Sequence, residues 1–245
     1  MKNNRVRFNI ILTLIFSIIL TGFIVSFAEE FEGDTIPAEE HAPKLNSNEV
    51  QEEIEKQNKI SEEYFNNKRT QGIGILSSGS RRLSVPLRQQ QNSYYCGPAS
   101  VQMTILQLRG SSPSQQTLAN NMGTNSSNGT YVYRVAQELQ KYTSYQYTTT
   151  SSSSYSSDLI YSIDKGKPMI AHVRASSLPH SPGAGAGHYI VNTGYMWGMS
   201  GSSAVDRVYY NDPHYNNNYY GSYYCTWSQM IKAINDRAGY YIRGQ

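Results

Sequence analysis

Cysteine is nearly absent from this sequence of 245 residues, which contains only Cys96 and Cys225. Two cysteines cannot build the disulfide framework that small secreted domains use in place of a large core, although one bridge between them is compatible with export. A bridge would remove Cys96 as a nucleophile, so the structural and the catalytic interpretations of this residue exclude one another. No repeat of solenoid length appears, and the length fits one ordinary domain with appendages.

The sequence also lacks residues at the spacing that a metal-binding motif requires. A ligand set drawn from His172, His188, Asp212 and His214 is conceivable. However, no pair among them has the i, i+4 helical spacing or the tight loop spacing of a zinc motif. The sequence therefore predicts no metal site.

The first 28 residues have the pattern of an export signal. Three basic residues precede an apolar run from Ile10 to Phe27, and Ala28 offers a small residue for cleavage. We therefore expect residues 1–28 to be a signal peptide and the remaining chain to be secreted or held at the cell surface. Because the apolar run is about as long as the minimum of roughly 18 residues for a membrane span, an uncleaved N-terminal anchor is the alternative.

Charge is distributed unevenly behind this signal. Residues 29–80 carry 12 acidic and 5 basic side chains, a net charge of −7, whereas residues 81–245 carry 6 acidic and 13 basic side chains, a net charge of +7. This asymmetry suggests that the acidic segment lies against a basic domain. The alternative is a solvated linker.

The acidic segment ends in a Gly- and Ser-rich stretch, residues 72–80, that predicts a flexible joint. Because Arg81 and Arg82 follow, a protease could cut there, and residues 29–80 are a candidate pro-segment; a plain tether is the other interpretation. Within this segment, Asn48 to Lys68 could form a helix that is stable only against a partner surface.

The domain from residue 81 to 245 is predicted to have the α+β class, with helices first and a largely antiparallel sheet after them. One helix is expected to open at Gly97-Pro98-Ala99 and to run up to Gly110. Further helices are expected over Ser114–Asn121 and Thr130–Tyr142, over the shorter stretch Ser157–Lys165, and from the capping residue Thr226 to Ile234. Strands are expected over Pro168–Val173, His188–Tyr195, Val205–Asn211 and Gly239–Arg243, with the Tyr-, Thr- and Ser-rich residues 143–157 as a link.

The helix that begins after Cys96 has a chemical consequence. Unpaired backbone N–H groups and the dipole at a helix N-terminus stabilise a thiolate, which is the reactive form of cysteine. His188 opens a predicted strand and Asp212 ends the next one, so neighbouring strands could join a base to the carboxylate that orients it. An oxyanion formed by thiolate attack would need donors, which Gln90 and the backbone N–H of Cys96 could supply.

Three segments in this order resemble the bacteriocin-processing, double-glycine-leader peptidases and their secreted relatives. The segments are Val85-Pro-Leu-Arg-Gln-Gln-Gln-Asn-Ser-Tyr-Tyr-Cys-Gly-Pro-Ala-Ser100, Gly187-His-Tyr-Ile-Val-Asn-Thr-Gly-Tyr195 and Tyr210-Asn-Asp-Pro213. The resemblance covers roughly residues 83–243 and implies a papain-like fold.

The same resemblance implies the roles of four residues. Cys96 would be the nucleophile, His188 its base and Asp212 the residue that holds His188. Gln90, rather than the adjacent Gln89 or Gln91, would complete the oxyanion hole. The substrate would be a peptide or protein, no nucleic acid is expected, and no cofactor is implied because thiol hydrolysis needs none.

Several alternatives remain open from the sequence. His214 is a rival to His188 as the base, and Cys225 is expected to be a small buried hydrophobe. The 21 tyrosines could form a peptide or carbohydrate surface, so a non-catalytic module that binds peptides or cell wall is a second hypothesis. A cell-wall amide hydrolase is a third. Because no ATP-binding module or multi-span region accompanies the domain, we do not expect leader processing coupled to transport.

Overall fold

The computed structural model describes residues 48–70, 79–143, 147–181, 187–198 and 206–244. All of these lie in one compact unit, Glu32–Gln245. The predicted signal segment, residues 1–28, and the acidic residues 29–47 lie outside the described residues. Among the helices that are described, none has the length and apolar character that crossing a membrane requires.

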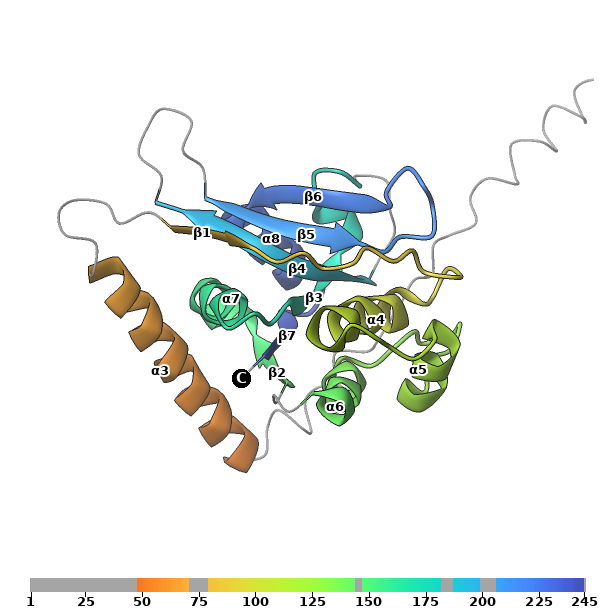
Figure 1. The fold of residues 1–245 in the computed structure, drawn as a ribbon, viewed down its shortest axis with the longest axis horizontal. Helices are drawn as coiled ribbons and strands as arrows, with labels where there is room; N and C mark the ends of the chain where they lie inside the picture. The colour runs from red at the N-terminus through yellow and green to blue at the C-terminus, as the bar shows by residue number, and fades with distance from the viewer. Residues whose placement is uncertain (1–47, 71–78, 144–146, 182–186, 199–205, 245) are drawn as a thin grey trace, which may run out of the picture. The chain divides into compact units, whose positions relative to one another are not determined.

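The α+β prediction is confirmed. Along the chain lie α3 (Asn48–Thr70), β1 (Gly79–Arg82), α4 (Cys96–Arg109), α5 (Gln115–Met122), α6 (Val132–Tyr142), β2 (Tyr147–Ser151), α7 (Tyr155–Asp164), β3 (Met169–Arg174), β4 (Gly187–Trp197), β5 (Arg207–Asp212), β6 (Gly221–Thr226), α8 (Trp227–Asn235) and β7 (Tyr240–Gly244). Helices α4, α5 and α6 gather beside the sheet, whereas α3 lies apart from them, next to α7 (Figure 1).

The described strands form one seven-stranded sheet. Its order is β2-β7-β3-β4-β5-β6, and β1 pairs with β4 off this path. Every pair is antiparallel. Strand β4 is central because one of its edges pairs with β3 over Gly187 to Asn192 and then with β1 over Gly194 to Trp197, while its other edge pairs with β5 over Val191 to Met196. The strand that carries His188 is therefore held on both edges from Val191 onward.

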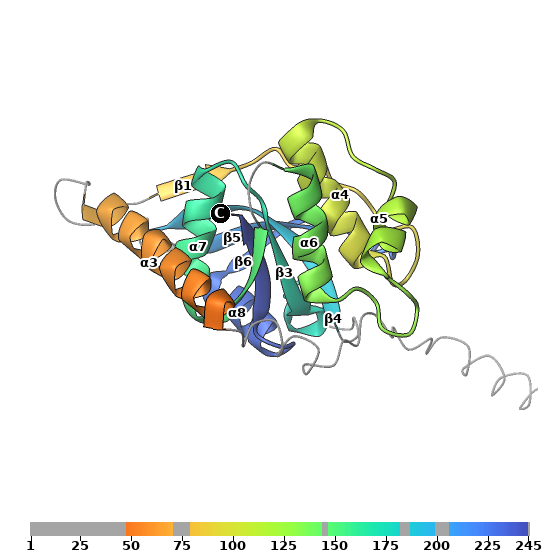
Figure 2. The same cartoon turned by 90° about the horizontal axis from the view of Figure 1, so that it is seen from below.

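Alternating side chains divide the core into two clusters. Ile170, Tyr189 and Val191 point to the side on which α4, α5 and α6 pack. Their neighbours Ala171 and Ile190 point to the other cluster, which α7 and α8 complete. Figure 2 shows α4, α5 and α6 grouped together beside the sheet.

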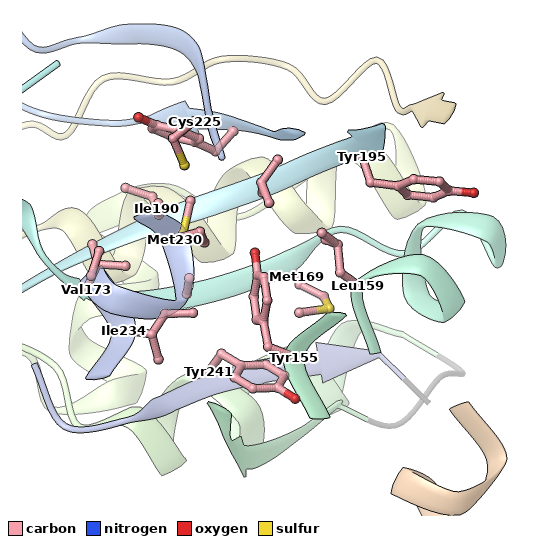
Figure 3. Packing of buried hydrophobic residues seen from close by; sticks show 14 of the residues in the cluster. Tyr155, Leu159, Met169, Val173, Ile190, Tyr195, Cys225, Met230, Ile234 and Tyr241 are labelled. Carbon is pink, nitrogen blue, oxygen red and sulfur yellow. The ribbon is translucent and has the colours of Figure 1, made fainter. Parts of the chain in front are cut away.

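Cys225 belongs to the second cluster and is almost fully buried, which confirms its expected role as a small hydrophobe. Figure 3 shows its sulfur among apolar side chains that include Ile190 and Met230. Cys96 lies in the first cluster, and neither cysteine is in a disulfide. The bridge that would have excluded catalysis is therefore not formed.

The predicted helix in the acidic segment is confirmed as α3, and its partner surface is α7 (Figure 1). Ser61 donates a hydrogen bond to buried Asp158, and Lys68 pairs with Asp164 at the end of α7. Phe65 packs edge-on against Trp197 with the ring centroids 5.5 Å apart. Polar pairs and aromatic contacts together dock this helix.

Three strands depart from the sequence predictions. The flexible joint was predicted through Ser80, whereas Gly79 to Arg82 form β1. The link over 143–157 contains β2 and the start of α7, and β6 was not predicted at all. Each of these strands is stabilised by hydrogen bonds to a strand that is distant in the sequence, and local sequence preference does not predict such pairing.

Candidate active site

Cys96 is the first residue of α4 and is fully buried. The first turn of this helix contains no acidic side chain, so the partial positive charge of the helix N-terminus is not offset from within the helix. Pro98 suits this first turn because it lacks an N–H group that would have no partner there. The helix ends at Gly110 in the left-handed conformation, as the sequence predicts.

Two contacts fix the first turn of α4 beside the start of β4. Ser100, one turn after Cys96, donates to the backbone carbonyl of Tyr189 at 3.2 Å. The Tyr189 hydroxyl donates to the carbonyl of Thr130 at 2.7 Å, and Thr130 packs directly on Gly97. Because Tyr189 follows His188, the thiol and the imidazole are carried by segments that lie against one another.

His188 and Asp212 are joined by a hydrogen bond of 2.7 Å between Nε2 and Oδ1. Val191 pairs with Asn211, so the antiparallel register continues to place Ile190 opposite Asp212. His188 is two residues from Ile190 and therefore lies on the same face, within reach of the carboxylate. The Asp212 bond occupies Nε2, and the second ring nitrogen of His188 is Nδ1.

Asp212 is fully buried but stays ionised. Burial by itself would raise its pKa, but the positive charge of His188 and the hydrogen bonds from His180 and His188 hold that pKa well below its usual range. The backbone N–H of His214 also donates to Oδ1 at 2.8 Å. A carboxylate held in this way can orient an imidazole and stabilise its protonated form.

His214 lies beside this pair but faces a different set of partners. Its ring centroid is 5.4 Å from that of His188, and its Nδ1 accepts a hydrogen bond of 2.9 Å from the backbone N–H of Asn216. Burial, reinforced by the charge of His188, lowers the pKa of His214 to about 4. His214 contacts Asp212 through its backbone, whereas His188 does so through its ring, so the geometry favours His188 as the base.

His172 is separate from this pair. It lies within β3, stacks on Tyr189 with centroids 4.5 Å apart, and accepts a bond of 3.2 Å from Arg237. Its surroundings are those of a histidine that packs inside a sheet as part of the core. Within the described ranges, no group of three or more His, Cys, Asp or Glu side chains could hold a metal ion.

Gln90 is buried, and its backbone joins the loop before Cys96 to the segment that carries Asp212. Its N–H donates to the carbonyl of Pro213, the residue after Asp212, at 2.7 Å. Its side-chain Nε2 donates to the carbonyl of Asn92 at 2.6 Å, which holds the amide within the turn that leads to Cys96. This bond uses one of the two hydrogens that an amide nitrogen carries.

The neighbouring glutamines are placed differently. The side chain of Gln89 donates to the Tyr215 carbonyl at 2.9 Å and to Asn217 at 2.7 Å, while Gln91 is exposed. Burial therefore distinguishes Gln90 from its two neighbours.

Gln115, which sequence reasoning missed, fixes the backbone on both sides of Gln90. Its Nε2 donates to the carbonyl of Gln89 at 2.8 Å, and its Oε1 accepts from the N–H of Gln91 at 3.0 Å. Gln115 is the first residue of α5 and is buried. No local pattern marks it, because its role depends on the packing of α5 against the loop.

His180 is a second residue that the sequence did not single out. Its Nε2 lies 2.8 Å from Oδ2 of Asp212, opposite the oxygen that faces His188. It follows Pro179 in a loop between β3 and β4, where no periodicity marks a function. Asp212 thus lies between two histidines.

The tyrosines do not form one common surface. Tyr155, Tyr189, Tyr195, Tyr210 and Tyr241 are fully buried and help to build the core. Among the tyrosines whose exposure is described, Tyr215 and Tyr224 are exposed. Packing in the core therefore accounts for part of the tyrosine content.

Fold and site together define a class. A buried thiol starts a helix whose first turn is bonded to the strand of a histidine–aspartate pair, on an antiparallel sheet, and a papain-like fold brings together elements of this kind. A comparison with protein families matches residues 82–235 to the Peptidase_C39 like family, and the chain belongs to that family. It is accordingly a cysteine-type peptidase, and its substrates are peptides or proteins.

Two solved structures are similar to this chain. A protein described as a C39-like peptidase from Bacillus anthracis is similar at 17% identity and a TM-score of 0.50, covering 68% of this chain and 98% of its own. The peptidase domain of Streptococcus ComA, a bi-functional ABC transporter involved in a quorum-sensing pathway, has 19% identity and a TM-score of 0.45, over 65% of this chain and 97% of its own. The first likeness supports the fold alone, and no argument rests on the second. No curated protein matches the sequence.

Proposed function

We propose that this chain hydrolyses peptide bonds with Cys96 as nucleophile, His188 as base, Asp212 as the residue that orients His188, and Gln90 as an oxyanion donor. The observation that carries the proposal is the 2.7 Å bond from His188 to buried Asp212, on a strand tied to the first turn of the Cys96 helix. Membership of a peptidase family supports the reaction class.

In the first half of the reaction, the Cys96 thiolate attacks the substrate carbonyl carbon and forms a C–S bond. The carbonyl π electrons move to oxygen, where the Gln90 amide and the Cys96 backbone N–H stabilise the oxyanion. His188 holds the proton that came from the thiol; because Asp212 engages Nε2, we assign this proton to Nδ1. Collapse of the tetrahedral intermediate breaks the C–N bond, and that proton passes to the leaving amine.

In the second half, a water molecule attacks the thioester that remains. His188 takes one proton from the water, the same donors stabilise the second oxyanion, and the C–S bond breaks to release a carboxylic acid and restore the thiolate–imidazolium pair. Asp212 stays ionised throughout, in keeping with its lowered pKa.

Hydrolysis of a mixed peptide library by the full chain tests the proposal. Cys96→Ala and His188→Ala should each abolish cleavage, while Cys225→Ser, which removes the other thiol from the core, should retain it. Cleavage that persists in Cys96→Ala at the level of the unchanged chain would show that another group is the nucleophile. Parallel incubation with purified peptidoglycan separates peptide hydrolysis from a cell-wall amidase.

Export is part of the proposal. The basic start and apolar run of residues 1–28 support it. Expression of the full gene followed by fractionation and N-terminal sequencing should find the mature chain outside the cytoplasm, beginning near Glu29. A chain retained in the cytoplasm with its first residue intact would contradict export.

The position of α3 bears on the suggested pro-segment. Helix α3 contacts β4 at Tyr195 and Trp197. Tyr195 is seven residues after His188, or about 23 Å along the strand at ~3.3 Å per residue. A helix docked there supports the domain without covering the imidazole.

We therefore expect a chain that begins near Arg82 to hydrolyse peptides at the same rate per folded molecule as one that begins near Glu29, and to unfold at lower urea concentration. The stability loss follows from exposing the buried Asp158–Arg243 pair, to which α3 contributes Ser61 and Asn58. A faster rate in the shorter chain would instead identify residues 29–80 as an inhibitor.

A further inference from the structure

Asp212 has a second histidine partner that the mechanism above does not use. His180 Nε2 lies 2.8 Å from Asp212 Oδ2, while His188 Nε2 lies 2.7 Å from Asp212 Oδ1. The His180 side chain is only 10% exposed, and that of Asp212 is 1% exposed. The two oxygens of one buried carboxylate are thus held by two different imidazoles.

The hydrogen-bond partners of His180 fix its tautomer. Its Nδ1 lies 2.8 Å from the hydroxyl of Tyr210. Burial raises the pKa of Tyr210, so this hydroxyl keeps its proton and can donate it to Nδ1, while the ionised Asp212 carboxylate can only accept a hydrogen bond from Nε2. A neutral imidazole that accepts at Nδ1 carries its hydrogen at Nε2, and that hydrogen points to Asp212.

Packing fixes the plane of the ring. His180 stacks on Tyr223 with the centroids 3.9 Å apart and an interplanar angle of 24°. The loop that carries it is closed by the buried Ser181, whose hydroxyl donates to the carbonyl of Ala175 at 2.8 Å. Ring and backbone are both constrained, so the direction of the Nε2–H bond is set in advance.

We infer that His180 is a positioning residue for the peptidase reaction, which locks the Asp212 carboxylate so that Oδ1 stays directed at His188. A carboxylate can turn about its Cβ–Cγ bond, and a turned Asp212 would no longer align with the His188 ring. The donor from His180 opposes this turn by engaging the other oxygen. The inference depends on the proposed roles of His188 and Asp212.

The first test compares His180→Phe with His180→Gln in the full chain. Phenylalanine keeps a flat ring for Tyr223 but has no N–H, whereas glutamine can place an amide N–H near the position of Nε2. Because a hydrogen bond to a charged group is a strong one, its loss in His180→Phe should lower kcat ~10- to 100-fold with little change in KM. His180→Gln should restore most of the lost kcat. Tyr223→Phe is the matched control, because it removes a hydroxyl from the same stack and leaves the ring.

The rates are measured per folded molecule, with a peptide from a mixed library that the unchanged chain cleaves. An unchanged kcat in folded His180→Phe, or a glutamine variant no better than phenylalanine, overturns the inference and leaves the proposed function intact. If the unchanged chain cleaves no peptide, the proposed function falls, and the inference with it.

A second measurement needs neither variant nor substrate. In the full chain labelled with ¹⁵N-histidine, the nitrogen resonances report which ring nitrogen of His180 is protonated. The inference requires a hydrogen at Nε2. An Nε2 without a hydrogen overturns it, even if the phenylalanine variant fails to fold.

Discussion

Replacement of Gly97 by alanine tests how the nucleophile helix is held. A Cβ atom at this position would lie 2.5 Å from Oγ1 and 2.8 Å from Cβ of Thr130. Non-bonded carbon atoms rest at ~3.5–4.0 Å, so the overlap is about 1 Å. Thr130 is fully buried, its hydroxyl is 2.8 Å from that of Thr124, and its carbonyl accepts from Tyr189, so the threonine cannot move aside easily.

The first turn of α4 must therefore shift, and Cys96 shifts with it. Overpacking of this kind costs ~1–3 kcal/mol of folding free energy. Misplacement of a reacting group by about 1 Å can cost ~100-fold in rate. We expect Gly97→Ala to lower the urea midpoint modestly and to lower kcat by one to two orders of magnitude, measured per folded molecule.

Gly110→Ala provides the control at the other end of the same helix. Gly110 has φ 74° and no atom near its missing Cβ, so alanine there costs ~1–2 kcal/mol through backbone strain alone. Stability should fall as in Gly97→Ala, but kcat should not. Adding Thr130→Gly to Gly97→Ala should recover activity. Normal kcat in Gly97→Ala, or no coupling in the double-mutant cycle, would refute the steric argument.

Three further outcomes are expected. Both thiols are buried, but the pKa of Cys225 is raised to about 12 whereas the start of α4 favours a Cys96 thiolate. Iodoacetamide at pH 8 should therefore label Cys96 faster than Cys225 in the folded chain, and equal labelling by mass spectrometry would contradict this difference in ionisation. The pKa of His214 is lowered to about 4 in the folded chain, below its unfolded value of ~6.5, so the unfolded state binds the proton more readily. Folding stability should therefore fall by up to about 3 kcal/mol as the pH is lowered from ~6.5 to about 4. His214→Phe should flatten that slope in urea titrations, and an unchanged slope would assign the acid sensitivity to other groups. Gln115→Met removes both bonds that flank Gln90, so kcat should fall ~10-fold with KM preserved, and an equal rise in KM alone would instead indicate a role in binding.

The helices could be predicted from local sequence because their ends are chemically marked. Pro98 and Gly110 delimit α4, and Ser114 caps α5 through a bond to the Thr117 backbone. Thr226 and Gln229 form the reciprocal cap that begins α8. Each of these features acts within one turn of chain, so a single sequence is enough to recognise it.

Residues whose roles depend on long-range pairing were not predictable. The alternation in β6 appears only as a tyrosine-rich stretch until β5 pairs with it residue by residue. His180 lies 32 residues from Asp212 along the chain, in a loop without periodicity, and only the fold brings them together. His188 and Asp212 could be proposed because each borders a strand whose pattern is visible.

The most direct measurement of the central claim is the alkylation rate of Cys96 as a function of pH in the full chain carrying Cys225→Ser, compared with the same chain bearing His188→Ala. It requires no knowledge of the substrate. The account predicts rapid labelling well below pH 8.5, the region in which an ordinary thiol ionises, and loss of this labelling when His188 is removed. Labelling that rises only near pH ~8.5 and is the same in both chains would contradict a thiolate–imidazolium pair.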